Sequence, residues 1–163
     1  MIDHRGNEVF IVEALKDYIS TEIRPCEVIR QNQNAPSPPY PYTTYTVTSL
    51  LPANGGTYSE LEDGTLYRNI TQTWSFTVQS DDQDEAYEIA MKIYDFFTAV
   101  ALTALAGKNI AVMRVQNVSP RDSFLTIEYE RRVGLDVTFG LMYTITPPAE
   151  VIETATFNNN KEV

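Results

Sequence analysis

The side chains that could do chemistry are mostly acids, and the densest group of them lies at residues 81–85. This segment, DDQDE, places four carboxylates within five residues. Carboxylates bind divalent cations, but the calcium-loop spacing D-x-[DN]-x-[DN]-G is absent. A helical pattern follows the segment, and the helix dipole favours negative charge at a helix start. We therefore interpret these acids as the start of a helix and predict no metal site.

Two other arrangements contain catalytic residue types. Glu128 and Glu130 share one face of a predicted strand and could form an acid/base pair. We favour a solvent-facing strand surface on which nearby arginines offset the acids.

Cys26 is the only cysteine and His4 the only histidine, too few ligands for a Cys/His zinc site. Free cysteines are usually buried, so we expect an inert thiol. With none of the common nucleotide-binding or hydrolase motifs present, the sequence predicts no catalytic, metal or cofactor site.

Composition limits the partners of the chain. Its 163 residues carry 22 acidic and 12 basic side chains, for a net charge of −10. Such a surface repels nucleic acid. The negative charge either serves solubility or forms a surface that DNA passes without binding. No apolar run reaches the roughly 18 residues of a membrane helix. Charges in the first ten residues predict no export signal.

Two segments have the pattern of helices. In residues 8–23, apolar residues recur every fourth position, Asn7 is a candidate cap, and Pro25 follows the end. In residues 82–106, a capping box is followed by an apolar face and a terminating glycine. That face is expected to contain Ile89, Ile93, Phe96, Phe97, Val100 and Ala104. Because the second half has few charges, we expect it to be buried more deeply than the first.

Alternating patterns predict the strands. The strongest is 133–145, in which every second residue from Val133 to Ile145 is apolar or aromatic. Further strands are expected at 42–51, 69–80, 109–118 and 122–131, with a short one near 26–32. Residues 53–68 are rich in turn signals and predict a long, mobile hairpin connection, and residues 119–122 predict a turn.

The order of these elements predicts an α+β fold. Two helices are too few for a doubly wound parallel sheet, and hairpin-length connections favour a mostly antiparallel sheet with both helices on one face. We expect a single domain over residues 1–146. The patternless residues 147–163 are expected to form a C-terminal tail, flexible or docked on a partner.

A proline-rich segment precedes the strand at 42–51. Pro36, Pro38, Pro39 and Pro41 fix their own φ angles and favour extended geometry in the residues before them. Because proline lacks an N–H group, this segment cannot pair as a central strand. It is expected to form a stiff arm at an edge of the domain.

Two stretches, 30–49 and 118–145, resemble a family of neck or tail terminator proteins of tailed bacteriophages and prophages. The similarity lies in Pro-Pro-Tyr-Pro-Tyr (38–42) ahead of a strand and in Glu130-Arg131-Arg132 followed by Gly134 and Asp136. The predicted helix 82–106 falls where that family has its long helix. The resemblance covers most of residues 8–146.

The resemblance implies a tail-terminator-like α+β subunit of a homo-oligomeric ring, commonly a hexamer. The ring would cap the tail tube, meet the tube protein and join the tail to the head connector or stopper protein. DNA would pass through its lumen without specific binding. The protein would lie in the virion neck after assembly in the host bacterial cytoplasm.

On this basis we expect the arm and a group of charged residues to lie at subunit boundaries, where Arg131, Arg132 and Asp136 would form ion pairs between copies. The candidate interface residues are Pro38, Pro39, Tyr40, Pro41, Tyr42, Arg131, Arg132 and Asp136. The alternative for the arm is a solvated edge that only blocks aggregation. The alternative for Arg131 and Arg132 is an exposed hairpin turn.

Two other functions remain open at this stage. One is a head-completion or connector adaptor, which is also an assembly protein. The other is a small-molecule-binding regulatory domain, since small α+β sheets often serve in that way.

Overall fold

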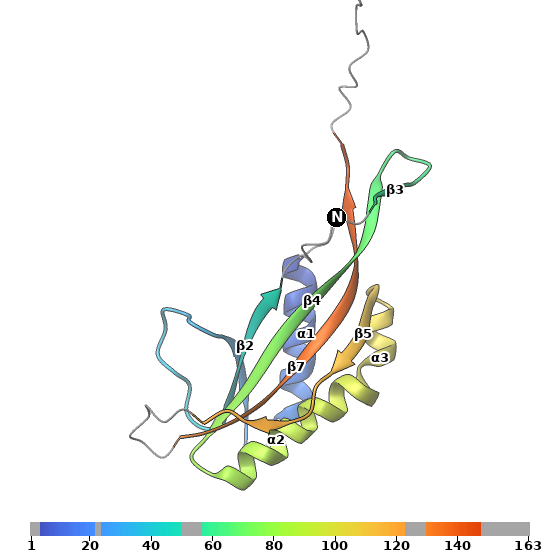
Figure 1. Ribbon diagram of the computed structural model, residues 1–163. Coiled ribbons are helices and arrows are strands. Elements are labelled where there is room, and N and C mark those ends of the chain that lie inside the picture. Colours follow the sequence, from blue (N-terminus) through green and yellow to red (C-terminus); the bar gives the residue numbers. More distant parts are fainter. Residues whose placement is uncertain (1–3, 22–23, 50–56, 123–129, 148–163) are drawn as a thin grey trace, which may run out of the picture.

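The computed structural model describes residues 4–21, 24–49, 57–122 and 130–147, and these residues form one sheet with helices packed against it (Figure 1). The strands follow the order β1-β2-β4-β7-β5, with β3 beside β4 and β6 beside β7. The elements are α1 (His4–Ile19), β1 (Glu27–Arg30), β2 (Tyr42–Ser49), β3 (Ser59–Glu60), β4 (Leu66–Ser80), α2 (Gln83–Asp95), the π-helical turn η1 (Phe96–Val100), α3 (Leu102–Ala106), β5 (Ile110–Val115), β6 (Ser119–Pro120) and β7 (Arg131–Ile145).

Antiparallel pairing dominates the sheet. Only β1 and β2 pair in parallel, whereas β4 pairs antiparallel with β2 and, along its full length, with β7. The predicted α+β class with a mostly antiparallel sheet is therefore confirmed.

Both long helices cover the same face of the sheet. Phe97 packs against Phe76 of β4 and Phe139 of β7, and α1 places Ile11 in the same hydrophobic cluster. The alternation of β7 produces this face, because Val133, Leu135, Val137, Phe139 and Leu141 are all buried. The opposite face is polar, and β4 presents Thr71, Thr73, Ser75 and Thr77 on it.

Several predicted boundaries are wrong. The first helix begins at His4, so Asn7 lies inside it and does not cap it. It ends at Ile19, after which the Ser20 hydroxyl accepts a hydrogen bond from Cys26 N and donates to Cys26 O. Residues 53–68 are predicted to form a long, mobile hairpin connection, but within them Ser59 and Glu60 pair with the start of β4 as a β3–β4 hairpin, whose Asp63-Gly64 turn uses a positive φ at Gly64.

The predicted buried face of the second helix is correct for Ile89, Ile93, Phe96 and Phe97 but wrong after Phe97. Val100 is 52% exposed and Ala104 is exposed, while Ala101 and Leu105 are buried in their place. The cause is η1, in which Ala101 N donates to Phe96 O, five residues back. A π-helical turn adds one residue to the helix, so the buried face moves on by one position.

The predicted turn at 119–122 is wrong in its first half, because Ser119 and Pro120 form β6 and pair with β7. The predicted strand at 122–131 lies almost wholly outside the described residues, as does Glu128 of the proposed acid pair. Of the predicted tail, only Pro147 is described.

Close approach explains Gly134, in the middle of the pairing region of β7. A Cβ atom there would lie 2.3 Å from Phe76 O and 2.8 Å from Arg121 Nε. We therefore expect Gly134→Ala to lower the free energy of unfolding by about 1–3 kcal/mol, the usual cost of overpacking. Urea unfolding followed by the fluorescence of Trp74, the only tryptophan, measures this loss.

Gly107→Ala is the matched control. Its nearest contacts to an added Cβ are ordinary, at 3.5 and 3.7 Å. This variant should be neutral or slightly stabilising, because alanine restricts the unfolded chain. Equal losses in the two variants would contradict the packing explanation.

Candidate subunit interface

The proline-rich arm and the start of β7 meet at one end of the sheet. The Tyr40 hydroxyl donates to Glu130 Oε2 at 2.6 Å, and Arg132 Nε donates to Glu130 Oε1 at 2.5 Å. One carboxylate thus joins two segments that are 90 residues apart in the sequence. These are the segments that carry the predicted interface residues, so the structure brings most of that set together.

The two tyrosines of the arm have different environments. Tyr40 is 43% exposed and stacks on Tyr42, with ring centroids 5.7 Å apart. Tyr42 begins β2 and is buried within its own chain. Of the two, Tyr40 therefore has the ring area that a neighbouring molecule can contact.

Each charged residue of the candidate set has a partner within its own chain. Arg132 binds Glu130, while Arg131 approaches Asp122 at 3.8 Å with both side chains nearly half exposed. A pair of this length and exposure contributes little to stability. Of these cations, Arg131 is therefore the most available to another molecule.

Asp136 lies on the open face of the sheet beneath Arg121. Arg121 Nη2 donates to Asp136 Oδ1 at 2.7 Å, and Nη1 donates to the hydroxyls of Ser75 and Thr77. Gly134 leaves the space that the arginine side chain crosses. Burial acts to raise the pKa of Asp136, but hydrogen bonds from Ser75 and Arg121 outweigh it and hold the pKa below 3.8.

The acidic segment 81–85 starts a helix, as predicted. Asp82 caps α2 by accepting from Asp84 N and Glu85 N. The capping box is modified, since Glu85 accepts from the Ser80 hydroxyl and Ser80 Oγ accepts from Asp82 N. Glu85 also forms an ion pair with Arg24. Among the described residues, no three His, Cys, Asp or Glu side chains are grouped as metal ligands would be.

Cys26 is fully buried, as expected. Burial raises the pKa of its thiol, with a smaller opposing effect from the Thr43 hydroxyl. This environment disfavours the reactive thiolate.

None of the helices in the described part of the chain is long and apolar enough to cross a membrane.

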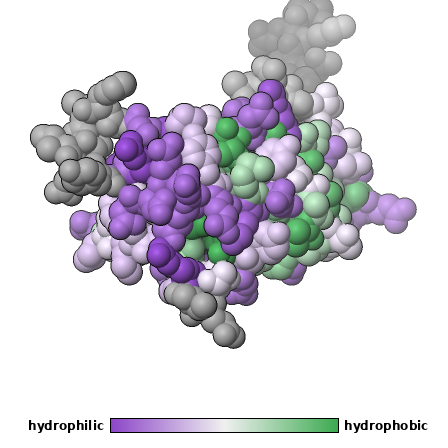
Figure 2. Space-filling view, turned by 90° about the horizontal axis from the view of Figure 1, so that it is seen from below, coloured by the Kyte–Doolittle hydropathy of each residue, from purple (hydrophilic) through white to green (hydrophobic). Residues whose placement is uncertain are grey.

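Sequence reasoning missed an apolar surface around α3 and β5. Leu102 and Met113 are 42% and 62% exposed, and they line an open groove of about 590 Å³. Seen from below, hydrophobic residues gather toward the side of the molecule that holds α3 and β5 (Figure 2). The low charge of residues 96–106 is the available signal, and it predicts burial where Val100 and Leu102 are exposed.

Comparison with known protein families decides between the assembly and regulatory interpretations. The family model described as phage neck terminator protein matches residues 10–162 of this chain. The chain belongs to the phage neck terminator family. No curated protein matches it significantly. Membership makes this a structural protein of the phage neck, as the resemblance predicted, and implies a place in the virion neck.

The low pKa of Asp136 gives a pH test of the open-face contacts. A carboxyl whose pKa is lower in the folded than in the unfolded state stabilises the fold above its unfolded pKa, and this contribution is lost as pH falls through the folded pKa. Asp136→Asn should therefore cost about 1–2 kcal/mol at pH 7, after allowance for partial exposure. The difference in the free energy of unfolding between the variant and the native protein should shrink below about pH 4. Urea unfolding at pH 7, 5, 4 and 3 measures this difference, and a difference independent of pH would contradict this account.

Proposed function

We propose that this neck terminator protein closes into a homo-oligomeric ring, a hexamer, that caps the head-proximal end of the tail tube. The ring joins the tail to the head connector or stopper protein, and the genome passes through its lumen. Assembly takes place in the cytoplasm of the bacterial host. The observation that carries this proposal is the family match over residues 10–162, which spans almost the whole chain.

The charge of the chain supports passage of DNA without binding. With 22 acidic against 12 basic residues, the ring lacks the surplus of cations that neutralises phosphates in DNA-binding proteins. Several of the described cations are also engaged by carboxylates, as Arg121 is by Asp136. A lumen with such a surface would release DNA rather than retain it.

We further propose that the arm and the start of β7 lie at a subunit boundary. Pro38, Pro39 and Pro41 keep the arm extended, so docking it costs little conformational entropy. Tyr40 and Arg131 supply the exposed contacts, while buried Tyr42 supports the Tyr40 ring. For Arg132 and Asp136 to pair between copies, Glu130 and Arg121 would have to be shared or released.

A head-completion or connector adaptor would be another structural role in the neck. It differs from a terminator in what it binds, because it would not cap isolated tail tubes. The regulatory alternative has less support, since none of the described residues that line the 590 Å³ groove has a titratable side chain that could orient a small ligand.

Native mass spectrometry tests the ring directly. The purified chain should give a closed species of six times its 18.4 kDa mass, and electron microscopy should show a ring with a central opening. Added tail tubes should carry the ring at one end only. A chain that stays monomeric at high concentration would contradict the ring.

Single substitutions test the arm. Tyr40→Ala should weaken each subunit contact by about 1–2 kcal/mol, as expected for an exposed aromatic anchor. Tyr40→Phe keeps the aromatic side chain but loses the hydrogen bond to Glu130. Comparing the two variants therefore separates the contribution of aromatic packing from that of the hydrogen bond. Sedimentation measures assembly, and Trp74 fluorescence confirms that the monomer is folded. An unchanged oligomer in Tyr40→Ala would remove the arm from the interface.

A further inference from the structure

One edge of the sheet is unpaired along β5. Within the described residues, β5 pairs with β7 alone, and no strand lies on its outer side. Its backbone groups on that side can therefore accept another strand. β5 carries a register shift at Met113 but no proline, so the edge is only partly protected against such pairing.

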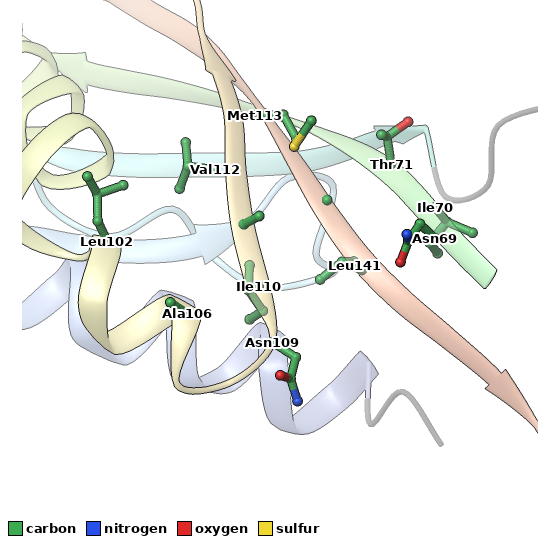
Figure 3. Close-up of a pocket in the computed structure, with 12 residues that line it drawn as sticks. Asn69, Ile70, Thr71, Leu102, Ala106, Asn109, Ile110, Val112, Met113 and Leu141 are labelled. Atoms are coloured by element: carbon green, nitrogen blue, oxygen red, sulfur yellow. The ribbon is translucent and has the colours of Figure 1, made fainter. Parts of the chain in front are cut away.

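The groove follows this edge on both faces of the sheet. Figure 3 shows Leu102 and Val112 to one side of the β5 ribbon and Met113 and Thr71 to the other. An added strand points alternate side chains to opposite faces, so one extended segment would contact both sides. The shape and the apolar lining thus suit a strand better than a compact ligand.

The charges near this edge favour an acidic segment. Lys108 lies just before β5 and Arg114 within it, and neither forms an ion pair with the described part of the chain. They stand out in a molecule with a net charge of −10. A segment with carboxylates at suitable spacing would complement them.

The C-terminal residues 148–163 have the matching chemistry. Residues 150–157, EVIETATF, are rich in β-branched residues, contain two glutamates and lack glycine and proline, which favours a strand. The family match extends to residue 162, so these residues belong to the part that the family shares. The occupant of the groove can therefore come from the chain itself.

The direction of β7 favours a neighbouring copy over the same chain. β5 begins at Ile110 opposite Leu141, whereas β7 continues to Ile145. Four more residues of strand carry the chain roughly 14 Å beyond the start of its own β5. At Ile145, the end of β7 therefore lies beyond the start of β5 and points away from it.

We propose that residues 148–163 of one copy pair with the β5 edge of the next copy, so that the sheet continues from subunit to subunit around the ring. Residues 150–157 lie along β5, apolar side chains contact Leu102 and Met113, and Glu150 and Glu153 give the segment a negative charge that complements Lys108 and Arg114. This inference rests on the proposed ring and identifies the surface and the segment that close it.

Disulfide trapping tests the pairing in the full-length chain. Met113→Cys is combined with a single cysteine at each position from 151 to 157 in turn, since directly opposed residues on one face bring their Cβ atoms within reach of a disulfide. The native Cys26 is fully buried and adds little background. Met91→Cys is the control, because Met91 is also an exposed methionine, 47% exposed against 62% for Met113, and lies on α2.

The expected result is covalent oligomers up to the size of the ring on non-reducing gels, at alternate positions only and only with Met113→Cys. Covalently closed monomers would overturn the proposal, because they place the segment on its own β5. The absence of cross-links at all seven positions would also overturn it.

A packing variant gives an independent readout. Met113→Asp should weaken self-association at least about tenfold, because it places a carboxylate in an apolar contact. Met91→Asp should leave self-association unchanged, and Trp74 fluorescence should show both variants folded. An intact ring in Met113→Asp would overturn this inference alone, whereas an unmodified chain that forms no ring would overturn the proposed function as well.

Discussion

The pairing of β4 with β7 is the constraint on which the rest of the structure depends. Fifteen consecutive residues pair without interruption, from Leu66 with Ile145 to Ser80 with Arg131. A slip of one residue would move every apolar side chain of either strand to the wrong face. This register sets the face on which the helices pack and brings Ser75 opposite Asp136 beneath Arg121.

The same pairing separates the two surfaces that we propose for assembly. The arm and the Glu130 contacts lie where β7 begins, and the free end of β7 lies fifteen residues away at its other terminus. The unpaired β5 edge runs between these two ends on one flank of the sheet (Figure 1). The two candidate surfaces therefore lie on different sides of the subunit, as the proposed head-to-tail ring requires.

Much of the fold could be predicted because it rests on local pattern. Alternation in 133–145 identified the buried face of β7, and Asp82 identified the start of α2, since both signals are contained in a few adjacent residues. The partners of Arg121, Glu130 and Tyr42 could not be predicted, because they come from segments tens of residues away. The start of the first helix at His4 and the pairing of β3 with β4 were not predicted, although the Asp63-Gly64 turn between β3 and β4 is a local signal.

The missed exposure of the second helix has a cause that sequence patterns do not register. A period of 3.6 assumes an unbroken helix, whereas the hydrogen bond from Ala101 N to Phe96 O inserts one extra residue. The pattern therefore gave the correct face up to Phe97 and the wrong one after it.

The inserted residue determines both which side chains of the helix fill the core and which lie at the surface. Ala101 and Leu105 fill the core only because the helix is one residue out of phase, and the same offset turns Val100 and Leu102 to the surface. A single-codon deletion between Phe97 and Ala101 would remove that residue, and the segment would become a regular α-helix in which Ala101 and Leu105 keep their buried positions.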